Sequence, residues 1–294
     1  MFGKKYPRNI IKTPDFNFFE LFSKTKIYNL KVIGLFIYPV KSLKGIGLEV
    51  SEVGNKGLKW DRRWMLVDQN NRFLSQREFP VLAKLKTGIS DKYLTIESFE
   101  NQEFLKISLD DFPIEKTKVK VWDDELEALV YAKDVNQWFT ERLGIEVRLV
   151  FQPEESIRPI DEKYAVTGDE ETSMSDGYPI LIIGEKSLEF LNSKCPENIV
   201  MERFRPNIVF EGGEAHIEDT FGAFQIGDVK LHGVKPCARC VMTTINPNTL
   251  EKTKEPLATL STYRKSGNKI LFGQNVVIHK AGVIRVGDRL LINN

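Results

Sequence analysis

Two cysteines, Cys237 and Cys240, are separated by two residues in the stretch VKPCARCVMTTINP. This spacing fits half of a zinc site, a dithiol redox couple, a disulfide, a thiolate ligand for another metal, or two unrelated core residues. Both flanks have strand character, which predicts a loop or strand end between two strands. That placement disfavours thioredoxin-like chemistry, in which the first cysteine opens a helix.

A structural zinc site needs four ligands. The other soft candidates are Cys195, His216, His232 and His279, and none repeats a CxxC or HxxxH spacing. Zinc is therefore possible but unsupported, and two small buried residues are the default interpretation of an isolated pair.

Basic and polar side chains occur at three predicted strand ends, in IYPVKSLKG, LKWDRRW and ERFRPNIV. Arginine binds phosphate through a bidentate fork and lysine as a point charge, while serine and asparagine add neutral hydrogen bonds. Each residue alone is better explained as a surface charge, an ion-pair partner or a turn residue. Together they predict one anion site, formed by Lys41, Ser42, Arg62, Arg63, Arg205 and Asn207.

The elements that must position these residues are mostly short strands from residue 29 onward, which resume through IVFEG, CVMTTINP (residues 240–247) and GVIRVGD. Helices are expected over DVNQWFTERLG, with Asp134 as N-cap and Gly144 as stop, and over residues 184–195. The pattern predicts an α+β, mostly β fold with a few short helices, and it lacks a regular βαβ rhythm.

Two charged segments lie outside this pattern. Residues 154–174 read as a long surface loop, which is uncommon unless the loop serves a site. The leader, residues 1–28, predicts a short helix after Pro14 that packs on its own domain, although a membrane-surface or organellar-address role stays open.

Composition limits the functional class. With 42 Lys plus Arg against 41 Asp plus Glu, generic nucleic-acid binding has little support. Three cysteines in 294 residues do not make a disulfide framework and favour a reducing, intracellular compartment. No apolar run approaches the ~18 residues that span a bilayer.

Seven motifs in order resemble the MOSC proteins, in the branch of the mitochondrial amidoxime reducing component: YPVKS, LKWDRRWMLVD, FLSQREFP, MSDGYPILII, RFRPNIV, KPCARCVMTTINP and LFGQNVVIHKAGVIRVGD. The resemblance runs from Asn29 to the end. It implies a MOSC β-barrel domain over 151–294 and a mixed, β-rich N-terminal MOSC region over 29–150. A strand around residues 34–42 is expected to pair with the barrel.

The resemblance also implies a molybdenum cofactor, Mo-molybdopterin, with Cys240 as metal ligand and catalytic residue. Cys237 has no ligand role, so the two cysteines are not expected to act as a pair. The family often has Ser or Thr where this chain has Gly177 and Tyr178, and an aromatic residue where it has Arg63, which predicts a more basic entrance. Matched cofactor-binding positions are Lys41, Ser42, Arg62, Asp176, Gly177, Tyr178, Arg205, Asn207, Arg239 and Asn275.

The implied reaction is the reduction of small N-hydroxylated compounds: amidoximes, hydroxylamines and N-oxides. The sequence has no GxGxxG loop, CxxCH motif or run of four cysteines, so a separate electron donor is expected. The resemblance implies that this donor is a b-type cytochrome reduced by an NADH-dependent flavin enzyme. A cofactor carrier or sulfuration-related binding module without turnover is the alternative, and a zinc-stabilised β protein is the third. Cytoplasm is the simpler location, with mitochondrial association left open.

Overall fold

Seven strands close into a β-barrel in the computed structural model of this chain, which describes residues 28–99, 101 and 103–292. The barrel confirms the predicted mostly β fold. Antiparallel pairing of the twelfth and seventeenth strands closes it. In order around the barrel the strands are β12 (Ile180–Gly184), β13 (Ile208–Glu211), β1 (Leu30–Ile37), β19 (Arg289–Ile292), β14 (Ala223–Ile226), β15 (Val229–Ala238) and β17 (Lys269–Lys280).

The barrel encloses a core of aliphatic and aromatic side chains, among them Val32, Phe210 and Phe224. Strand β1 is hydrogen-bonded to β13 and β19, so the first described strand is built into a barrel whose other strands come from the second half of the chain. Smaller elements flank the barrel: β2 (Ile46–Leu48), β3 (Val50–Gly54), β4 (Gly57–Leu58), β16 (Lys265–Ser266), β18 (Gly282–Arg285), α2 (Glu185–Asn192) and α3 (Leu257–Ser261).

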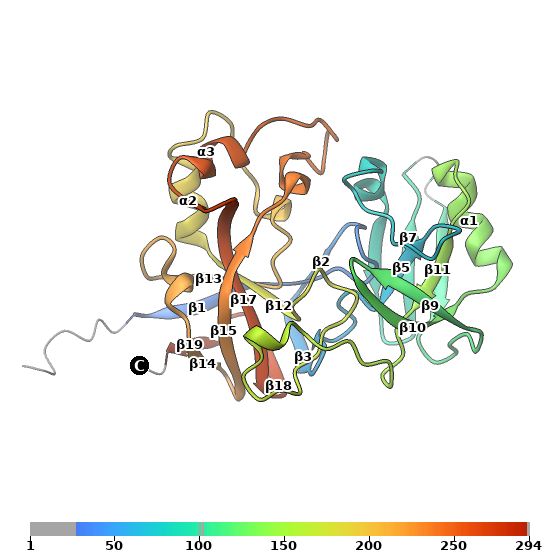
Figure 1. The fold of residues 1–294 in the computed structure, drawn as a ribbon, viewed down its shortest axis with the longest axis horizontal. Coiled ribbons are helices and arrows are strands. Elements are labelled where there is room, and N and C mark those ends of the chain that lie inside the picture. The colour runs from blue at the N-terminus through green and yellow to red at the C-terminus, as the bar shows by residue number, and fades with distance from the viewer. Residues whose placement is uncertain (1–27, 100, 102, 293–294) are drawn as a thin grey trace, which may run out of the picture.

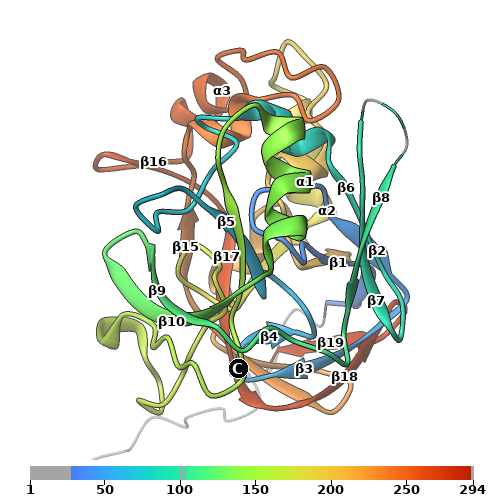
Figure 2. The ribbon, with the colours of Figure 1, turned by 90° about the vertical axis from the view of Figure 1, so that its right-hand side faces the viewer.

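A second lobe lies beside the barrel (Figure 1). It contains a four-stranded and a three-stranded sheet around a separate core that includes Trp64, Leu94 and Phe139. Helix α1 covers one side of this lobe (Figure 2). Its elements are β5 (Trp64–Val67), β6 (Lys86–Ile89), β7 (Tyr93–Glu97), β8 (Phe104–Ser108), β9 (Lys116–Val121), β10 (Asp124–Val130), α1 (Lys133–Leu143) and β11 (Arg148–Phe151).

Helix α1 matches the prediction at one end only. It ends at Gly144, whose φ of 65° is the left-handed C-cap conformation that favours glycine. The predicted N-cap is wrong: Ala132 caps the helix without a side-chain hydrogen bond, and Asp134 lies in the first turn. A carboxylate there still interacts favourably with the helix dipole.

The predicted strand over residues 240–247 is also wrong. Residues Val241–Thr244 form a 3₁₀ turn instead. The hydroxyl of Thr243 donates to the Cys240 carbonyl at 3.0 Å, and that of Thr244 to the Val241 carbonyl at 2.7 Å. Such local bonds compete with strand pairing.

Residues 154–174 form an irregular segment with one 3₁₀ turn, Glu162–Tyr164, but the segment is not wholly on the surface as predicted. Arg158 is buried and donates to the carbonyls of Ser173 and Ser175. The buried Glu170 accepts three backbone N–H bonds from residues 166–168. The charged residues of this segment led to the prediction of an exposed loop, but Arg158 and Glu170 are buried because hydrogen bonds within the protein compensate their charges.

Within the described ranges, no helix is long and apolar enough to cross a membrane. The predicted leader helix falls outside the described residues.

Gly57, in the first half of the chain, lies very close to the backbone of Pro179 in the second half. Its φ is +108°, and a Cβ there would lie 2.5 Å from the carbonyl oxygen of Pro179. We expect Gly57→Ala to destabilise the fold by at least about 1–3 kcal/mol, the usual cost of such backbone strain, as measured by denaturant unfolding. Gly54→Ala in the same hairpin is the control, because a Cβ there meets nothing within 4 Å. Equal effects would contradict the account.

Candidate active site

A pocket lies where the barrel meets the second lobe, and the eleven residues that the resemblance matched to metal-binding or cofactor-binding positions all line it. They come from the segment after β1, the turn before β5, the segment before β12, the segment before β13, the residues directly after β15, and the middle of β17. The residues are Lys41, Ser42, Arg62, Asp176, Gly177, Tyr178, Arg205, Asn207, Arg239, Cys240 and Asn275.

The lining is strongly basic. Five cationic side chains line the pocket and Asp176 is its one acidic residue among the described part of the chain. An excess of fixed positive charge in a concave site attracts anions. The cations are Lys41, Arg62, Arg77, Arg205 and Arg239.

The backbone is strained at three lining positions. Ser42, Arg62 and Arg205 have φ angles of 71°, 50° and 54°. Residues other than glycine rarely adopt this left-handed backbone conformation. It costs on the order of 1–3 kcal/mol for each residue, and residues in such conformations cluster at functional sites. The three residues therefore depart from strand geometry at positions that line the pocket.

Two arginines are held against Tyr38, which follows β1. The guanidinium carbons of Arg62 and Arg205 lie 4.1 and 4.0 Å from its ring centroid. Arg62 also pairs at 2.5 Å with the fully buried carboxylate of Asp61, which accepts the Tyr38 amide at 2.8 Å. Burial, reinforced by the charge of Arg62, lowers the pKa of Arg205 to about 10. Both groups are thus positioned before any ligand binds.

Several donors in this region lack a partner within the described residues: Arg205 Nη2, Arg239 Nε and the Tyr178 hydroxyl. Leaving a buried donor unpaired costs about 1–3 kcal/mol. Their presence in one electropositive pocket fits a bound group rich in acceptor oxygens. Asn207 differs, because its amide already bonds the backbone of Phe36 and Leu181 and so ties strands together.

The two cysteines have separate environments. The Cys240 thiol is exposed and lies 3.6 Å from Arg77 Nη1. The Cys237 thiol accepts from Arg239 Nη1 at 3.1 Å. All three cysteines are free, and in the described part of the chain no group of three or more His, Cys, Asp or Glu could hold a metal ion.

The carboxylate of Asp176 accepts a hydrogen bond from Lys41 Nζ at 2.6 Å. Burial of the lysine outweighs this partner and lowers its pKa to about 8. For Asp176, burial disfavours the charged form, but the positive charges of Lys41, Arg77 and Arg62 outweigh this and hold the carboxyl pKa below its usual range. The pair therefore stays ionic near neutral pH.

Sequence reasoning missed Arg77 and Phe73, which also line the pocket. Both belong to the second lobe and lie within the motif FLSQREFP, to whose residues the resemblance assigned no role. The prediction that Arg63 makes the entrance more basic is wrong. Arg63 does not line this pocket; its guanidinium is turned to the carbonyl of Gln152 and the carboxylate of Glu154.

Lys41 should make anion binding depend on pH. We expect sulfate, which keeps its charge, to bind the cofactor-free protein more weakly as pH rises past about 8, because Lys41 loses its proton there, whereas the arginines keep theirs. Isothermal titration calorimetry between pH 6.5 and 9.5 measures this. In Lys41→Met, sulfate should bind more weakly than to wild type, and its affinity should not change over that pH range. The same pH dependence in Lys41→Met as in wild type would contradict the assignment.

Comparison with known proteins agrees with the motifs. Residues 29–146 match the MOSC N-terminal beta barrel domain and residues 169–291 the MOSC domain. The chain is 32% identical over 273 residues to mitochondrial amidoxime-reducing component 1 of Mus musculus, covering 87% of this chain and 80% of that protein. The Homo sapiens protein of that name is 33% identical over 279 residues, covering 87% and 81%.

The chain belongs to the MOSC-domain family, of the amidoxime-reducing component type. The predicted resemblance is confirmed. This MOSC protein is also 30% identical over 277 residues to the molybdenum cofactor sulfurase of Oryza sativa subsp. japonica, covering 87% of this chain and 34% of the sulfurase.

Proposed function

We propose that this MOSC protein is a molybdenum-cofactor-dependent reductase of N-hydroxylated compounds that receives electrons from a separate donor protein. The observation that carries the proposal is the exposed thiol of Cys240 in a pocket lined by five cations. A thiolate suits a soft metal, and the cations suit an anionic group on the same ligand. The names of the mammalian relatives support the reaction class.

The lining fits a molybdopterin that carries a phosphate. Cys240 Sγ would bind molybdenum, while Lys41, Arg62 and Arg205 would hold the phosphate, with Ser42 beside them. The unpartnered Arg205 Nη2 supplies a donor for one oxygen. When bound, molybdenum supplies two-electron chemistry that removes oxygen from nitrogen. Overall, two electrons and two protons convert an N-hydroxyl group into N–H and water.

The side chains of this chain would bind, orient and shield. The Tyr38 stack and Asp61 fix the two arginines. Arg77 contacts the Cys240 thiol and adds positive charge beside it. Asp176, whose side chain is 58% exposed, offers an acceptor to a substrate that carries N–H groups.

The electron source belongs to the proposal. We propose a separate donor, and the resemblance to the amidoxime-reducing component type favours a b-type cytochrome reduced by an NADH-dependent flavin enzyme. An intracellular location, cytoplasmic in the simplest case, is supported by three unpaired cysteines.

A cofactor carrier or sulfuration-related module is the second candidate, supported by the match to the rice sulfurase. Turnover separates the two. Protein from a molybdopterin-competent host, supplied with reduced methyl viologen, should convert benzamidoxime to benzamidine over many cycles if it is a reductase. Binding of the cofactor without catalysis would favour the carrier.

A further inference from the structure

Trp122 occupies an unusual position at the edge of the active-site pocket. It lies in the two-residue turn between β9 and β10, with a φ of 58°. Such turns favour Asn, Asp or Gly, and a bulky residue in this conformation is an outlier that points to function. Trp122 is also 48% exposed, so burial of its ring does not explain its presence.

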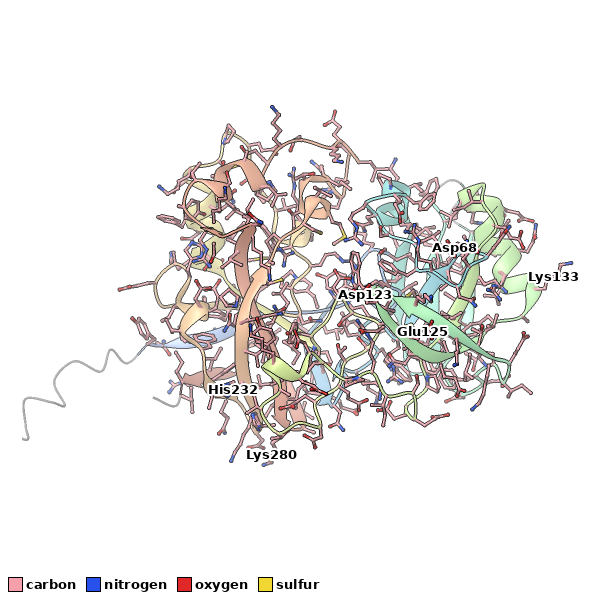
Figure 3. The ribbon with its side chains drawn as sticks, viewed as in Figure 1. Asp68, Asp123, Glu125, Lys133, His232 and Lys280 are labelled. Atoms are coloured by element: carbon pink, nitrogen blue, oxygen red, sulfur yellow. The ribbon has the colours of Figure 1, made fainter. Side chains whose placement is uncertain are left out.

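Trp122 is not itself a lining residue, but its ring and its indole N–H interact with three residues that line the pocket. The guanidinium carbon of Arg77 lies 4.4 Å from the indole centroid. The ring of Phe73 packs edge-on with centroids 5.1 Å apart. The indole N–H donates to Asp176 Oδ1 at 3.4 Å. The adjacent Asp123 lies at the side of the second lobe that faces the barrel (Figure 3).

These contacts connect the indole to the reacting end of the pocket. Arg77 reaches from the indole to the Cys240 thiol, with 3.6 Å between Nη1 and Sγ. Asp176 holds Lys41 on the same wall. The indole is therefore connected to the thiol through Arg77 and to Lys41 through Asp176.

We infer that Trp122 determines substrate specificity by providing a stacking surface for flat, conjugated amidoximes, whose N–H groups are received by Asp176. The inference rests on the proposed reductase function. Aromatic stacking and cation–π attraction to an indole favour a delocalised, planar group. The exposed part of the carboxylate beside the ring accepts N–H donors in the plane of that group.

The test compares a flat substrate with one that has no ring. In wild type, Trp122→Ala and Trp122→Phe, KM and kcat are measured for benzamidoxime and for hydroxylamine, with reduced methyl viologen as donor. Phe104→Ala is the matched control, because Phe104 is 57% exposed in β8, a strand with no residue in the pocket lining, whereas Trp122 contacts three lining residues. Calorimetric binding of benzamidine, the product, gives a readout that needs no turnover.

For Trp122→Ala we expect KM for benzamidoxime and Kd for benzamidine to rise about tenfold, the scale of one lost stacking contact. KM for hydroxylamine should not change, and Trp122→Phe should restore most of the loss. A rise in KM of the same size for both substrates, or no rise in KM for either, would overturn the inference. If wild type reduces neither substrate, the reductase proposal fails, and the benzamidine affinities alone then decide the role of Trp122.

Discussion

Cys240→Ser is expected to lose molybdenum and reductase activity together, by at least about a hundredfold, since even changing the partners of metal ligands costs 10–100-fold. A serine hydroxyl is a poor replacement for thiolate toward a soft metal. The mechanism of loss is local, because the Cys240 thiol is exposed and supports no core. Metal content by mass spectrometry and benzamidoxime turnover measure the effect on the same preparation.

Cys237→Ser is the matched control three residues away. A serine oxygen can still accept from Arg239, whose other terminal nitrogen donates to the Phe204 carbonyl at 2.7 Å. We expect molybdenum content and kcat close to wild type. Equal losses in the two variants would mean that the cysteines act as a pair, and the assignment of Cys240 alone as ligand would be wrong.

Arg62→Met is expected to lower the free energy of unfolding by about 3–5 kcal/mol, the usual effect of breaking a buried ion pair. The carboxylate of Asp61 is fully buried and would keep only the Tyr38 amide among its described partners. Unfolding in guanidinium chloride, followed by circular dichroism, measures this loss of stability. The variant should also bind sulfate more weakly, because it removes one of the pocket's cations.

Lys59→Met provides the comparison for Arg62. Lys59 forms an ion pair with Glu52 at 2.8 Å, but half or more of each side chain is exposed, so the expected loss is about 0–1 kcal/mol. The double variant Asp61→Asn with Arg62→Met should recover part of the stability, because it removes the buried charge. If it is no more stable than Arg62→Met, the unpaired carboxylate is not the cause.

The alternation of residues along the chain predicted a mostly β fold, because strands such as β7 and β9 carry their buried side in the sequence. The barrel and the cofactor-binding positions were implied by the family motifs, not by this alternation. Lys41, Arg62 and Arg205 follow or precede strands, and strand ends converge in a barrel. The family motifs then supplied a common ligand that no single residue implied.

The misses share a physical cause: each depends on which partner a polar group finds in three dimensions. Arg63 turned to the carbonyl of Gln152, and Arg158 was buried by carbonyl partners. The Thr243 hydroxyl donates to the backbone carbonyl of Cys240, and a turn forms where a strand was predicted. Arg77 reached the thiol only because the second lobe packs against the barrel, and no spacing in the sequence records that contact.

The assignment of a molybdenum cofactor to this pocket is tested by measuring molybdenum and released pterin in the wild-type protein, purified from a molybdopterin-competent host. We expect near-stoichiometric amounts of both, with metal measured by mass spectrometry and pterin by fluorescence. Zinc in place of molybdenum, or neither metal nor pterin from a host that loads other molybdoenzymes, would contradict the assignment and leave Cys240 without a role as molybdenum ligand.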